Sequence, residues 1–373
     1  TFLVTDRAAA DRPMGALTGD FIFVGDVGRP DLLERAAGIT GTMETSARAL
    51  FASLQRFKTL PDYLQLWPGH GAGSACGKAL GAVPQTTLGY ERLFNWALTV
   101  EDAAEFVSAV LAGQPEPPAY FARMKRVNRD GPAPLGALPR PALLNADALE
   151  DALRRGDTVL DTRGVEDFAA RHVPGTLNVP RNRSFSAWAA ALAPEGGAIL
   201  LVADDDASAA AAARDLALVG VDGARGYVSP ATIAKWSERH GGLGSVPQTD
   251  VRALAATLDA GAAPLVLDVR GKAEWEAGHL PGAVHIPLGE LPARAGELPR
   301  DRPIAVHCQG GTRSAIASSV LRAKGVADVT NVRGGYGEWE RLGLPTVSDE
   351  AGVSAGTGAP GGTPADASAT SAR

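Results

Sequence analysis

The chain has 373 residues, 45% of them hydrophobic and 21% charged, and a formal net charge of -6. This length predicts two or three folded domains with ordinary soluble cores. The acidic balance without long basic blocks argues against nucleic acid or an acidic membrane surface as partner, and no apolar run approaches the roughly 20 residues that span a bilayer. Two cysteines argue against a disulfide framework and favour a reducing cytoplasm.

Two polar residues stand at candidate strand ends in the first segment, residues 1–113. Asp20 ends the first apolar piece of the second of three apolar stretches, and His70 follows the third. A carboxylate and an imidazole from neighbouring strand ends could serve one metal site, although single residues of this kind are more often caps or turn formers. The apolar stretches predict strands over residues 2–5, 16–24 and 63–67.

The rest of this segment indicates packing more than chemistry. Thr99 and Asp102 form a capping pair ahead of a helical pattern that ends at Gly113. Cys76 stands in a glycine-rich loop after His70. Its thiol could be structural or could serve as a resting site for sulfur, and the sequence leaves both interpretations open.

Residues 114–141 contain many prolines and predict a linker laid over a surface. A basic patch inside the linker could attract an anionic thiol such as glutathione or coenzyme A, with a solvated face as the simpler interpretation. The patch consists of Arg123, Lys125, Arg126 and Arg129.

The next two segments, residues 142–243 and 244–347, repeat one another. TVLDTRGVEDFAARHVPGTLNVP (158–180) aligns without a gap with LVLDVRGKAEWEAGHLPGAVHIP (265–287). A repeat of this length predicts two copies of one α/β domain.

Within the second copy, a short apolar strand runs into a cysteine, a turn and an alanine-rich helix over residues 303–324. Cys308 stands where the strand ends, so its sulfur should lie at the C-terminal edge of a sheet. Gly310 and Gly311 allow the chain to turn back tightly.

The surroundings of Cys308 suit an anionic sulfur. Thr312 or Ser314 is expected to cap the helix, so that several amides and the helix dipole point into the loop. Together with Arg313 they would stabilise a thiolate or a persulfide and make the sulfur nucleophilic. A lone cysteine is more often buried and inert, but the glycines and the arginine favour Cys308 and Arg313 as catalytic residues. The substrate would contact Gln309, Gly310, Gly311 and Thr312.

In the first copy the same loop has lost its nucleophile. Ala203 aligns with Cys308, and residues 204–206 place three carboxylates where the other copy collects amides. Ser208 aligns with Arg313. Because carboxylates repel an anionic sulfur donor, we interpret this copy as degenerate and structural, with a role in docking.

Four further polar residues of the second copy are interpreted as structural groups that hold the turn and the strand ends around the loop. The four residues are Asp268, Arg270, His279 and His285.

His307 precedes Cys308 on a strand, so its side chain should point away from the sulfur pocket.

The loop from Cys308 to Arg313, with LVLDVR (265–270) and EAGHLPGAVHIP (276–287), resembles the active loop and upstream signature of the rhodanese family. The resemblance implies an α/β domain with a parallel sheet between helices. It also implies a cysteine that carries a persulfide between a donor and an acceptor. The loop is of the shorter type associated with sulfur transfer, whereas the related dual-specificity phosphatases and arsenate reductases have one more residue.

The first segment resembles the second half of a metallo-β-lactamase-fold domain, most like the persulfide dioxygenases. The resemblance rests on LTGD, GRPD and WPGHG between residues 17 and 71. It implies that Asp20 is a metal ligand, that His70 lies at the metal site and that Arg29 organises the substrate side. Because the strand pattern is already under way at Thr1, we expect part of this domain to precede it.

The metal site expected from this resemblance is incomplete. No histidine precedes His70, so the His-x-His-x-Asp-His motif of the family is missing. The resemblance implies Fe(II) in the full-length protein, with Zn as the alternative. In this chain the metal should be weakly bound or absent, because an open catalytic site normally has three protein ligands.

The sequence therefore predicts a cytoplasmic α/β protein of persulfide metabolism. A rhodanese-type sulfurtransferase acting through Cys308 would be coupled, in the full-length protein, to iron-dependent persulfide oxidation. Alternatives are a glyoxalase-II-like thioester hydrolase with rhodanese domains and a non-catalytic sulfur carrier. Partners would be a small persulfide, thiosulfate, or a glutathione or coenzyme A thiol, with a homo-oligomer left open. The expected parts are a partial metallo-β-lactamase αββα fold (1–113), a linker (114–141), a degenerate and an active rhodanese-like domain (142–243, 244–347) and a disordered tail (348–373).

Overall fold

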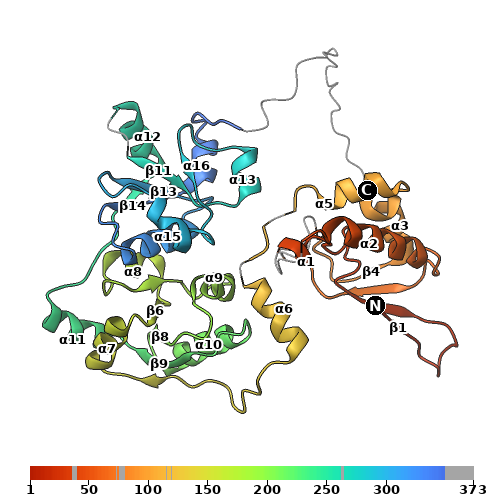
Figure 1. Ribbon diagram of the computed structural model, residues 1–373, viewed down its shortest axis with the longest axis horizontal. Helices are drawn as coiled ribbons and strands as arrows, with labels where there is room; N and C mark the ends of the chain where they lie inside the picture. The colour runs from red at the N-terminus through yellow and green to blue at the C-terminus, as the bar shows by residue number, and fades with distance from the viewer. Residues whose placement is uncertain are drawn as a thin grey trace, which may run out of the picture.

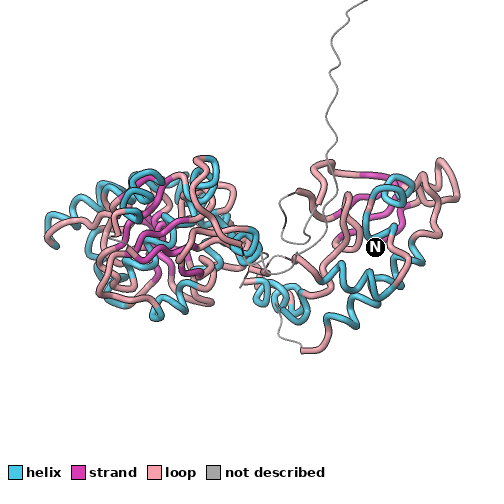
Figure 2. The backbone as a smooth tube through the Cα atoms, turned by 90° about the horizontal axis from the view of Figure 1, so that it is seen from above, coloured by secondary structure: helices cyan, strands magenta, loops and turns pink. Residues whose placement is uncertain are grey.

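The chain forms three units, each built on its own sheet, in a computed structural model (Figure 1). Two of the units pack together, and the first segment stands apart from them (Figure 2). Cys76 and nearly all of the expected tail lie outside the described residues. The structure describes residues 1–35, 40–72, 74, 80–114, 116–118, 120–261 and 264–348.

The first unit is a mixed four-stranded sheet with helices packed on it. The central strands β2 and β3 run parallel, whereas the outer pairs are antiparallel. The strands, in sheet order, are β1 (Phe2–Val4), β2 (Gly15–Gly19), β3 (Gln65–Pro68) and β4 (Thr86–Thr87). The helices are α1 (Leu32–Arg35), α2 (Met43–Phe57), α3 (Leu88–Phe94), α4 (Trp96–Thr99) and α5 (Ala103–Leu111).

The strand expected over residues 16–24 is shorter than predicted. It ends at Gly19, whose φ of +56° takes the chain out of the ladder. Ile22 and Phe23 are still fully buried, but they reach the core from a turn in which Thr18 Oγ1 donates to the Ile22 carbonyl at 2.7 Å. The apolar run therefore indicated burial correctly and strand geometry wrongly.

The prediction that Thr99 and Asp102 form a capping pair is right for Asp102 and wrong for Thr99. Asp102 alone caps α5, because its Oδ1 accepts from the amides of Ala104 and Glu105 at 2.9 and 2.8 Å. The Thr99 hydroxyl instead donates to the Trp96 carbonyl at 2.9 Å, at the end of the preceding helix. The helix expected there is present as α5, and its buried residues Phe106 and Val110 pack into the core of the first unit.

The expected linker contains a helix, α6 (Phe121–Asp130), that contacts the middle unit. Its prolines stand before and after this stretch, which leaves a proline-free run able to form helical hydrogen bonds. Arg123 donates to the Val219 carbonyl at 3.1 Å, and Arg126 pairs with Glu195 at 2.5 Å. The simpler interpretation of a solvated face is therefore wrong for Arg123, which is buried, whereas Arg126 remains exposed in its ion pair.

The middle and last units have the same sheet order and only parallel pairings, which confirms the duplication. The middle sheet, in order, is β5 (Ala142–Leu143), β9 (Ala224–Val228), β8 (Ile199–Val202), β6 (Thr158–Asp161) and β7 (Leu177–Asn178). Its helices are α7 (Ala146–Arg155), α8 (Val165–Ala170), α9 (Phe185–Leu192), α10 (Asp206–Ala217) and α11 (Pro230–His240).

The last unit repeats this arrangement around the strand that precedes Cys308. Its sheet, in order, is β10 (Gln248–Asp250), β14 (Val329–Arg333), β13 (Ile304–His307), β11 (Leu265–Asp268) and β12 (Val284–His285). Its helices are α12 (Val251–Asp259), α13 (Lys272–Ala277), α14 (Leu291–Arg294), the 3₁₀ helix η1 (Ala295–Glu297), α15 (Thr312–Ala323) and α16 (Gly335–Arg341).

The middle and last units share one hydrophobic core. Buried side chains of both sheets belong to a single cluster, to which α15 contributes Ile316 and Val320. The Asn178 amide of β7 donates to the Ser319 hydroxyl of α15 at 2.9 Å across the contact, and Figure 1 shows α15 beside α8. The helix that follows Cys308 is thus held from both sides. Within the described ranges, the structure contains no helix long and apolar enough to cross a membrane.

Candidate active site

Cys308 lies at the C-terminal edge of the last sheet, directly after β13, and is 2% exposed. The Gly311 amide donates to its Sγ at 3.1 Å. Gly311 has a φ of +107°, a conformation that favours glycine and turns this amide back toward the sulfur. One amide of the loop therefore contacts the sulfur, where the sequence predicted several.

The expected cap of α15 is absent. Gly311 occupies the N-cap position, and no described side chain caps the first turn. Thr312 is the first helical residue, and the Ser314 hydroxyl donates to the Gly311 carbonyl at 3.0 Å without accepting from an amide. Because no side chain satisfies these amides, the positive end of the helix remains available to an anion near Cys308.

A second glycine turn, missed in the sequence, supports the loop from behind. The amides of Tyr336 and Gly337 donate to the carbonyls of Cys308 and Gln309 at 2.7 and 3.0 Å. Gly335 has a φ of +58°, and a Cβ on it would lie 2.2 Å from the Cys308 carbonyl oxygen. The run GGYG at residues 334–337 was the available signal, since adjacent glycines mark a close backbone approach.

Arg313 is held in an ion pair with Glu274 of α13. Its two terminal nitrogens donate to the Glu274 carboxylate at 2.6 and 2.7 Å. Burial alone would lower the pKa of Arg313, but the hydrogen bonds and charge of Glu274, followed by the Cys308 sulfur, raise it above its usual value. Arg313 thus ties the loop to α13, and its charge also acts on the sulfur. Sequence reasoning missed Glu274.

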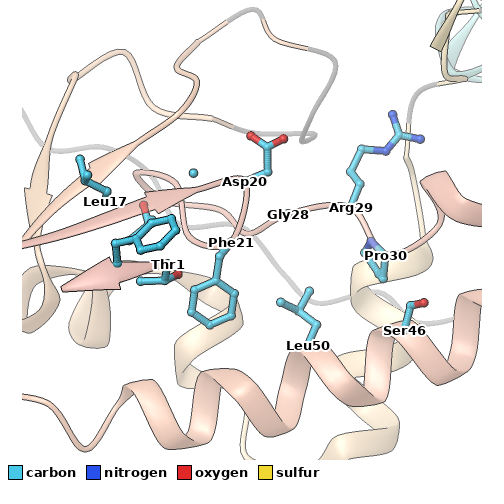
Figure 3. Close-up of a pocket in the computed structure, with 12 residues that line it drawn as sticks. Thr1, Leu17, Asp20, Phe21, Gly28, Arg29, Pro30, Ser46 and Leu50 are labelled. Atoms are coloured by element: carbon cyan, nitrogen blue, oxygen red, sulfur yellow. The ribbon is translucent and has the colours of Figure 1, made fainter. Parts of the chain in front are cut away.

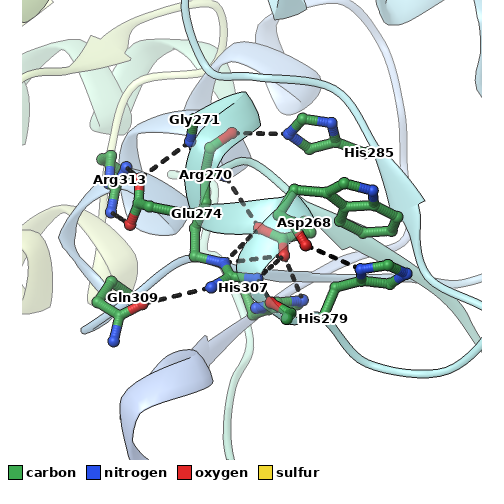
Figure 4. Close-up of polar contacts among 11 residues, drawn as sticks. Asp268, Arg270, Gly271, Glu274, His279, His285, His307, Gln309 and Arg313 are labelled. Atoms are coloured by element: carbon green, nitrogen blue, oxygen red, sulfur yellow. Dashed lines mark hydrogen bonds and ion pairs between the residues drawn. The ribbon is translucent and has the colours of Figure 1, made fainter. Parts of the chain in front are cut away.

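A buried polar network lies under the loop (Figure 4). Arg270, 1% exposed, donates to Asp268 at 2.7 Å and to the Gly278 carbonyl at 2.6 Å, and its guanidinium lies 3.8 Å from the centre of the Tyr336 ring. It also approaches Gln309 Oε1 at 3.5 Å, the limit of a hydrogen bond. These contacts are structural, as expected for Asp268 and Arg270.

The three histidines of the last unit also serve the scaffold. His285 Nε2 lies 2.9 Å from the Arg270 carbonyl oxygen, and His279 Nδ1 lies 2.9 Å from that of Trp275. His307 is buried with its Nε2 3.7 Å from Asp268, on the face of β13 opposite Cys308. Burial lowers the pKa of His307.

The sulfur opens into a pocket of about 470 Å³ that both units line. This shared wall was not predicted, because the two sets of residues are far apart in the sequence. The last unit contributes Cys308, Gly310, Thr312 and Arg313, and the middle unit contributes Asn182, Arg183, Ser184 and Trp188.

The corresponding edge of the middle sheet has no thiol. Ala203 is buried at 1% exposure, as expected for the degenerate copy. The Asp205 carboxylate accepts from the Ser208 amide at 2.8 Å and caps α10. Asp206 accepts from the Tyr227 hydroxyl at 2.5 Å, which raises the pKa of Tyr227 to about 12. Two of the three carboxylates therefore form structural hydrogen bonds at the positions where the last unit has the loop around Cys308.

In the first unit, Asp20 and His70 meet. They follow the parallel strands β2 and β3, and Asp20 Oδ1 lies 2.7 Å from His70 Nδ1, with both side chains exposed. In the described part of the chain, no three His, Cys, Asp or Glu side chains are grouped so that they could hold a metal. Two donors are fewer than an open catalytic site requires, so the described residues do not by themselves fit iron or zinc.

Arg29, expected on the substrate side of that site, forms an ion pair with Asp31. Its Nη2 lies 2.6 Å from Asp31 Oδ2, and both side chains are fully buried. Arg29 and Asp20 line an open pocket of about 640 Å³ (Figure 3). The contact with Asp31 indicates that Arg29 holds the loop after Gly28 in place.

Comparison with known proteins places both folds. The profile of the rhodanese-like domain matches residues 145–236 and 250–342. A sulfurtransferase of Allochromatium vinosum is 40% identical over 86 residues, which are 23% of this chain and 80% of that protein. A putative sulfur carrier protein of Bacillus subtilis is 38% identical over 95 residues, which are 26% of this chain and 51% of that protein.

The crystal structure of a metallo-β-lactamase from Staphylococcus aureus is also similar. It aligns with a TM-score of 0.52 and 38% identity over 61% of this chain and 62% of that chain. This chain thus spans less than two thirds of that structure. The expected fold class is confirmed, and the matches support sulfurtransferase activity in sulfur metabolism. The chain belongs to the rhodanese family, as two rhodanese-like domains fused to a segment of metallo-β-lactamase fold.

Proposed function

We propose that this chain is a sulfurtransferase in which Cys308 carries sulfane sulfur as a persulfide. The observation that carries the proposal is the contact of the Gly311 amide with Cys308 Sγ at 3.1 Å, at the foot of a pocket between the two rhodanese-like domains. Amide donors and an uncapped helix start stabilise an anionic sulfur before and after transfer. The sulfurtransferase of Allochromatium vinosum supports the same activity.

The reaction has two balanced steps with thiosulfate as donor. The Cys308 thiolate attacks the sulfane sulfur, a new S–S bond forms, and the S–S bond of thiosulfate breaks so that sulfite leaves with its electron pair. The persulfide anion on Cys308 then gives its outer sulfur to a nucleophile such as cyanide or a thiolate. The electron pair of the second broken bond returns to Cys308 as the thiolate.

The test is sulfur transfer from thiosulfate to cyanide by the whole chain. Cys308→Ser should reduce the rate to background, because a hydroxyl cannot form a persulfide, and the melting temperature should stay close to that of the unmodified protein. Cys76→Ser is the matched control and should keep activity. Turnover in the Cys308→Ser protein would refute the assignment.

A non-catalytic sulfur carrier is the competing function, supported by the name of the Bacillus subtilis relative. A carrier would take up one sulfur atom on Cys308, visible as added mass, without repeated turnover. Cyanide or small thiols present in excess distinguish the two, since an enzyme forms many products per Cys308.

For a full-length protein we also propose iron-dependent persulfide oxidation coupled to this transfer, with Zn as the alternative metal. The contact between Asp20 and His70 supports a shared site, but these two residues need further ligands that the described residues do not supply. A form extended upstream through a His-x-His-x-Asp-His motif should bind iron and lose it on Asp20→Ala. Two bound zinc ions in that form would favour the thioester hydrolase.

The proposed partners are small sulfur compounds: a persulfide, thiosulfate, or a glutathione or coenzyme A thiol. We propose a reducing cytoplasm as the location, because a persulfide carrier needs a free thiol. Neither nucleic acid nor a membrane is proposed as a partner. A homo-oligomer remains open to measurement by light scattering.

A further inference from the structure

The wall of the Cys308 pocket that comes from the middle domain is a short loop after β7. Asn182, Arg183 and Ser184 line the pocket from this loop, and Trp188 lines it from the first half of α9. Phe185 comes directly after Ser184, at the start of α9, and is 1% exposed in the core that both domains share. The buried ring fixes the loop at the pocket, so its polar residues are held near the sulfur.

The active loop itself brings little free positive charge to this pocket. Residues 309–312 carry no charged side chain. Arg313 lines the pocket, but both of its terminal nitrogens are bonded to Glu274 at 2.6 and 2.7 Å. An anionic donor that enters the pocket therefore needs its charge balanced from elsewhere.

Arg183 is placed to provide this charge. Its side chain is exposed, and it forms no hydrogen bond or ion pair within the described part of the chain. Arg181, two residues earlier, contrasts with it, because its Nε donates to Asp215 at 3.1 Å and it does not line the pocket. Of the two arginines on this loop, only Arg183 is both at the pocket and free to bind a ligand.

We propose that Arg183 determines donor specificity at Cys308 by binding the oxyanion end of the donor, such as the sulfonate group of thiosulfate or of a thiosulfonate. The inference rests on the proposed sulfur transfer and names its donor class. The planar guanidinium offers a fork of N–H groups that matches two oxygens of a sulfonate. The sulfane sulfur then faces Cys308, and Arg183 also holds the charge on the sulfite that leaves.

The degenerate domain acquires a function by this inference. It has no thiol at Ala203, yet it supplies a recognition side chain to the sulfur site of its neighbour. Trp188, which is half-buried, provides an apolar wall beside that side chain. The pair favours a small donor with one charged end over a neutral or bulky one.

The first test compares Arg183→Gln with Arg181→Gln in the whole chain. Arg183→Gln should raise KM for thiosulfate about tenfold, the value of one charge-assisted hydrogen bond, with a smaller change in kcat. Arg183→Lys should recover part of the loss, because it keeps the charge without the fork. Arg181→Gln should leave KM unchanged. Equal KM values in the two Gln variants would overturn the proposal.

The second test does not depend on turnover. Cys308 is alkylated with anionic iodoacetate and with neutral iodoacetamide, and its modification is followed by peptide mass spectrometry. Arg183→Gln should slow iodoacetate several-fold relative to iodoacetamide, whereas Arg181→Gln should leave the ratio unchanged. If both reagents slow equally, Arg183 acts on the thiolate or on the fold, and the specificity role is refuted.

The two tests separate this inference from the proposed function. A protein that transfers no sulfur but shows the change in alkylation ratio retains the anion site and refutes the transferase assignment. A protein that transfers sulfur through Cys308 with an unchanged ratio and an unchanged KM retains the transferase assignment and refutes the role of Arg183.

Discussion

In both rhodanese-like domains, the strand next to the central one ends in an aspartate that accepts hydrogen bonds from an arginine two residues later. These strands are β6, which ends at Asp161, and β11, which ends at Asp268. Arg163 donates to Asp161 at 2.6 Å and to the Arg171 carbonyl at 3.0 Å. Arg270 makes the matching bonds to Asp268 at 2.7 Å and to the Gly278 carbonyl at 2.6 Å. The polar network under the loop has thus been kept in the copy without a thiol.

The ring stacks beside this network are kept as well. His172 stacks on Phe168 at 4.1 Å between ring centres, and its Nδ1 lies 3.0 Å from the Phe168 carbonyl oxygen. His279 stacks on Trp275 at 3.5 Å with the equivalent contact at 2.9 Å. Because these groups persist without chemistry, they belong to the scaffold of the domain.

The two domains differ in the loop and in what holds it. The last domain has Gly311 and Gly335 at positive φ and the pair formed by Arg313 and Glu274. The middle domain caps α10 with Asp205 and begins α11 after a capping Ser229. The comparison teaches that a rhodanese-like scaffold leaves the loop free to hold either an anionic sulfur or ordinary helix caps.

Among changes that keep Cys308, the largest expected effect comes from Gly335→Ala. The added methyl would lie 2.2 Å from the Cys308 carbonyl oxygen, and the φ of +58° strains any side chain. Displacement of the loop should lower kcat/KM by about 100-fold. Gly343→Ala is the matched control, since its φ is +66° and no atom lies within 4 Å of the added carbon. It should lower the melting temperature slightly and keep activity, and equal activity in the two variants would contradict the role of Gly335.

A direct attempt to erase the difference is Ala203→Cys in a protein that also carries Cys308→Ser. We expect no sulfur transfer, because the new thiol would stand beside residues 204–206, whose carboxylates disfavour a thiolate. Its alkylation at pH 7 should be about tenfold slower than that of Cys308 in the unmodified protein. Alkylation as fast as at Cys308 would show that the carboxylates do not matter.

A smaller effect is expected from Glu274→Gln, which breaks the ion pair with Arg313. Transfer should fall about five- to tenfold as the loop loses its tie to α13. Asp167→Asn is the matched change in the middle domain, where the partner position is Ser208, and it should have no effect. An equal loss in both variants would indicate a general electrostatic effect in place of a local one.

The same pair predicts a pH dependence. Burial opposes the ionisation of Glu274, but the hydrogen bonds and charge of Arg313 outweigh it, so the pKa of Glu274 lies below its usual range. A carboxyl whose pKa is lower in the folded state contributes stability above its unfolded pKa and loses it as pH falls through the folded value. The melting temperatures of the unmodified protein and the Glu274→Gln variant should therefore differ at pH 7 and converge below about pH 4.

The sequence predicted the features of the site that depend on local order along the chain. Cys308 follows a strand, Gly311 turns the loop, and Ala203 replaces the thiol in the other copy, each as expected. These follow from strand pattern, glycine and alignment of the repeat, which need no knowledge of distant contacts. The sequence left open that Asp20 and His70 serve one site, and the parallel strands β2 and β3 bring the two side chains together.

The remainder could not be predicted because it depends on distant segments. Glu274, on α13, forms the ion pair with Arg313 on α15, and Arg183 lines the pocket from the other domain. The helix α6 was hidden by the prolines on both sides of it, which suggested an extended linker. Thr312 was misassigned as a possible cap because a hydroxyl residue at a helix start has the same signature whether it is the cap or the first helical residue.

The smallest effect concerns His307, whose counterpart in the middle domain is Val202: each pairs across the sheet with the aspartate that ends the neighbouring strand. His307 is 1% exposed, and neither ring nitrogen has a hydrogen-bond partner among the described residues. Burial lowers its pKa, against the opposing charge of Asp268, while Arg270 lowers it further.

The unfolded chain therefore binds a proton at His307 at a pH where the folded chain does not. The free energy of unfolding should fall by up to about 1.4 kcal/mol per pH unit below about pH 6.5. His307→Val should remove this part of the acid sensitivity while changing stability at pH 7 by about 1 kcal/mol or less. Urea unfolding between pH 5 and pH 7.5 measures both quantities, and an unchanged acid slope in the valine variant would show that another group is responsible.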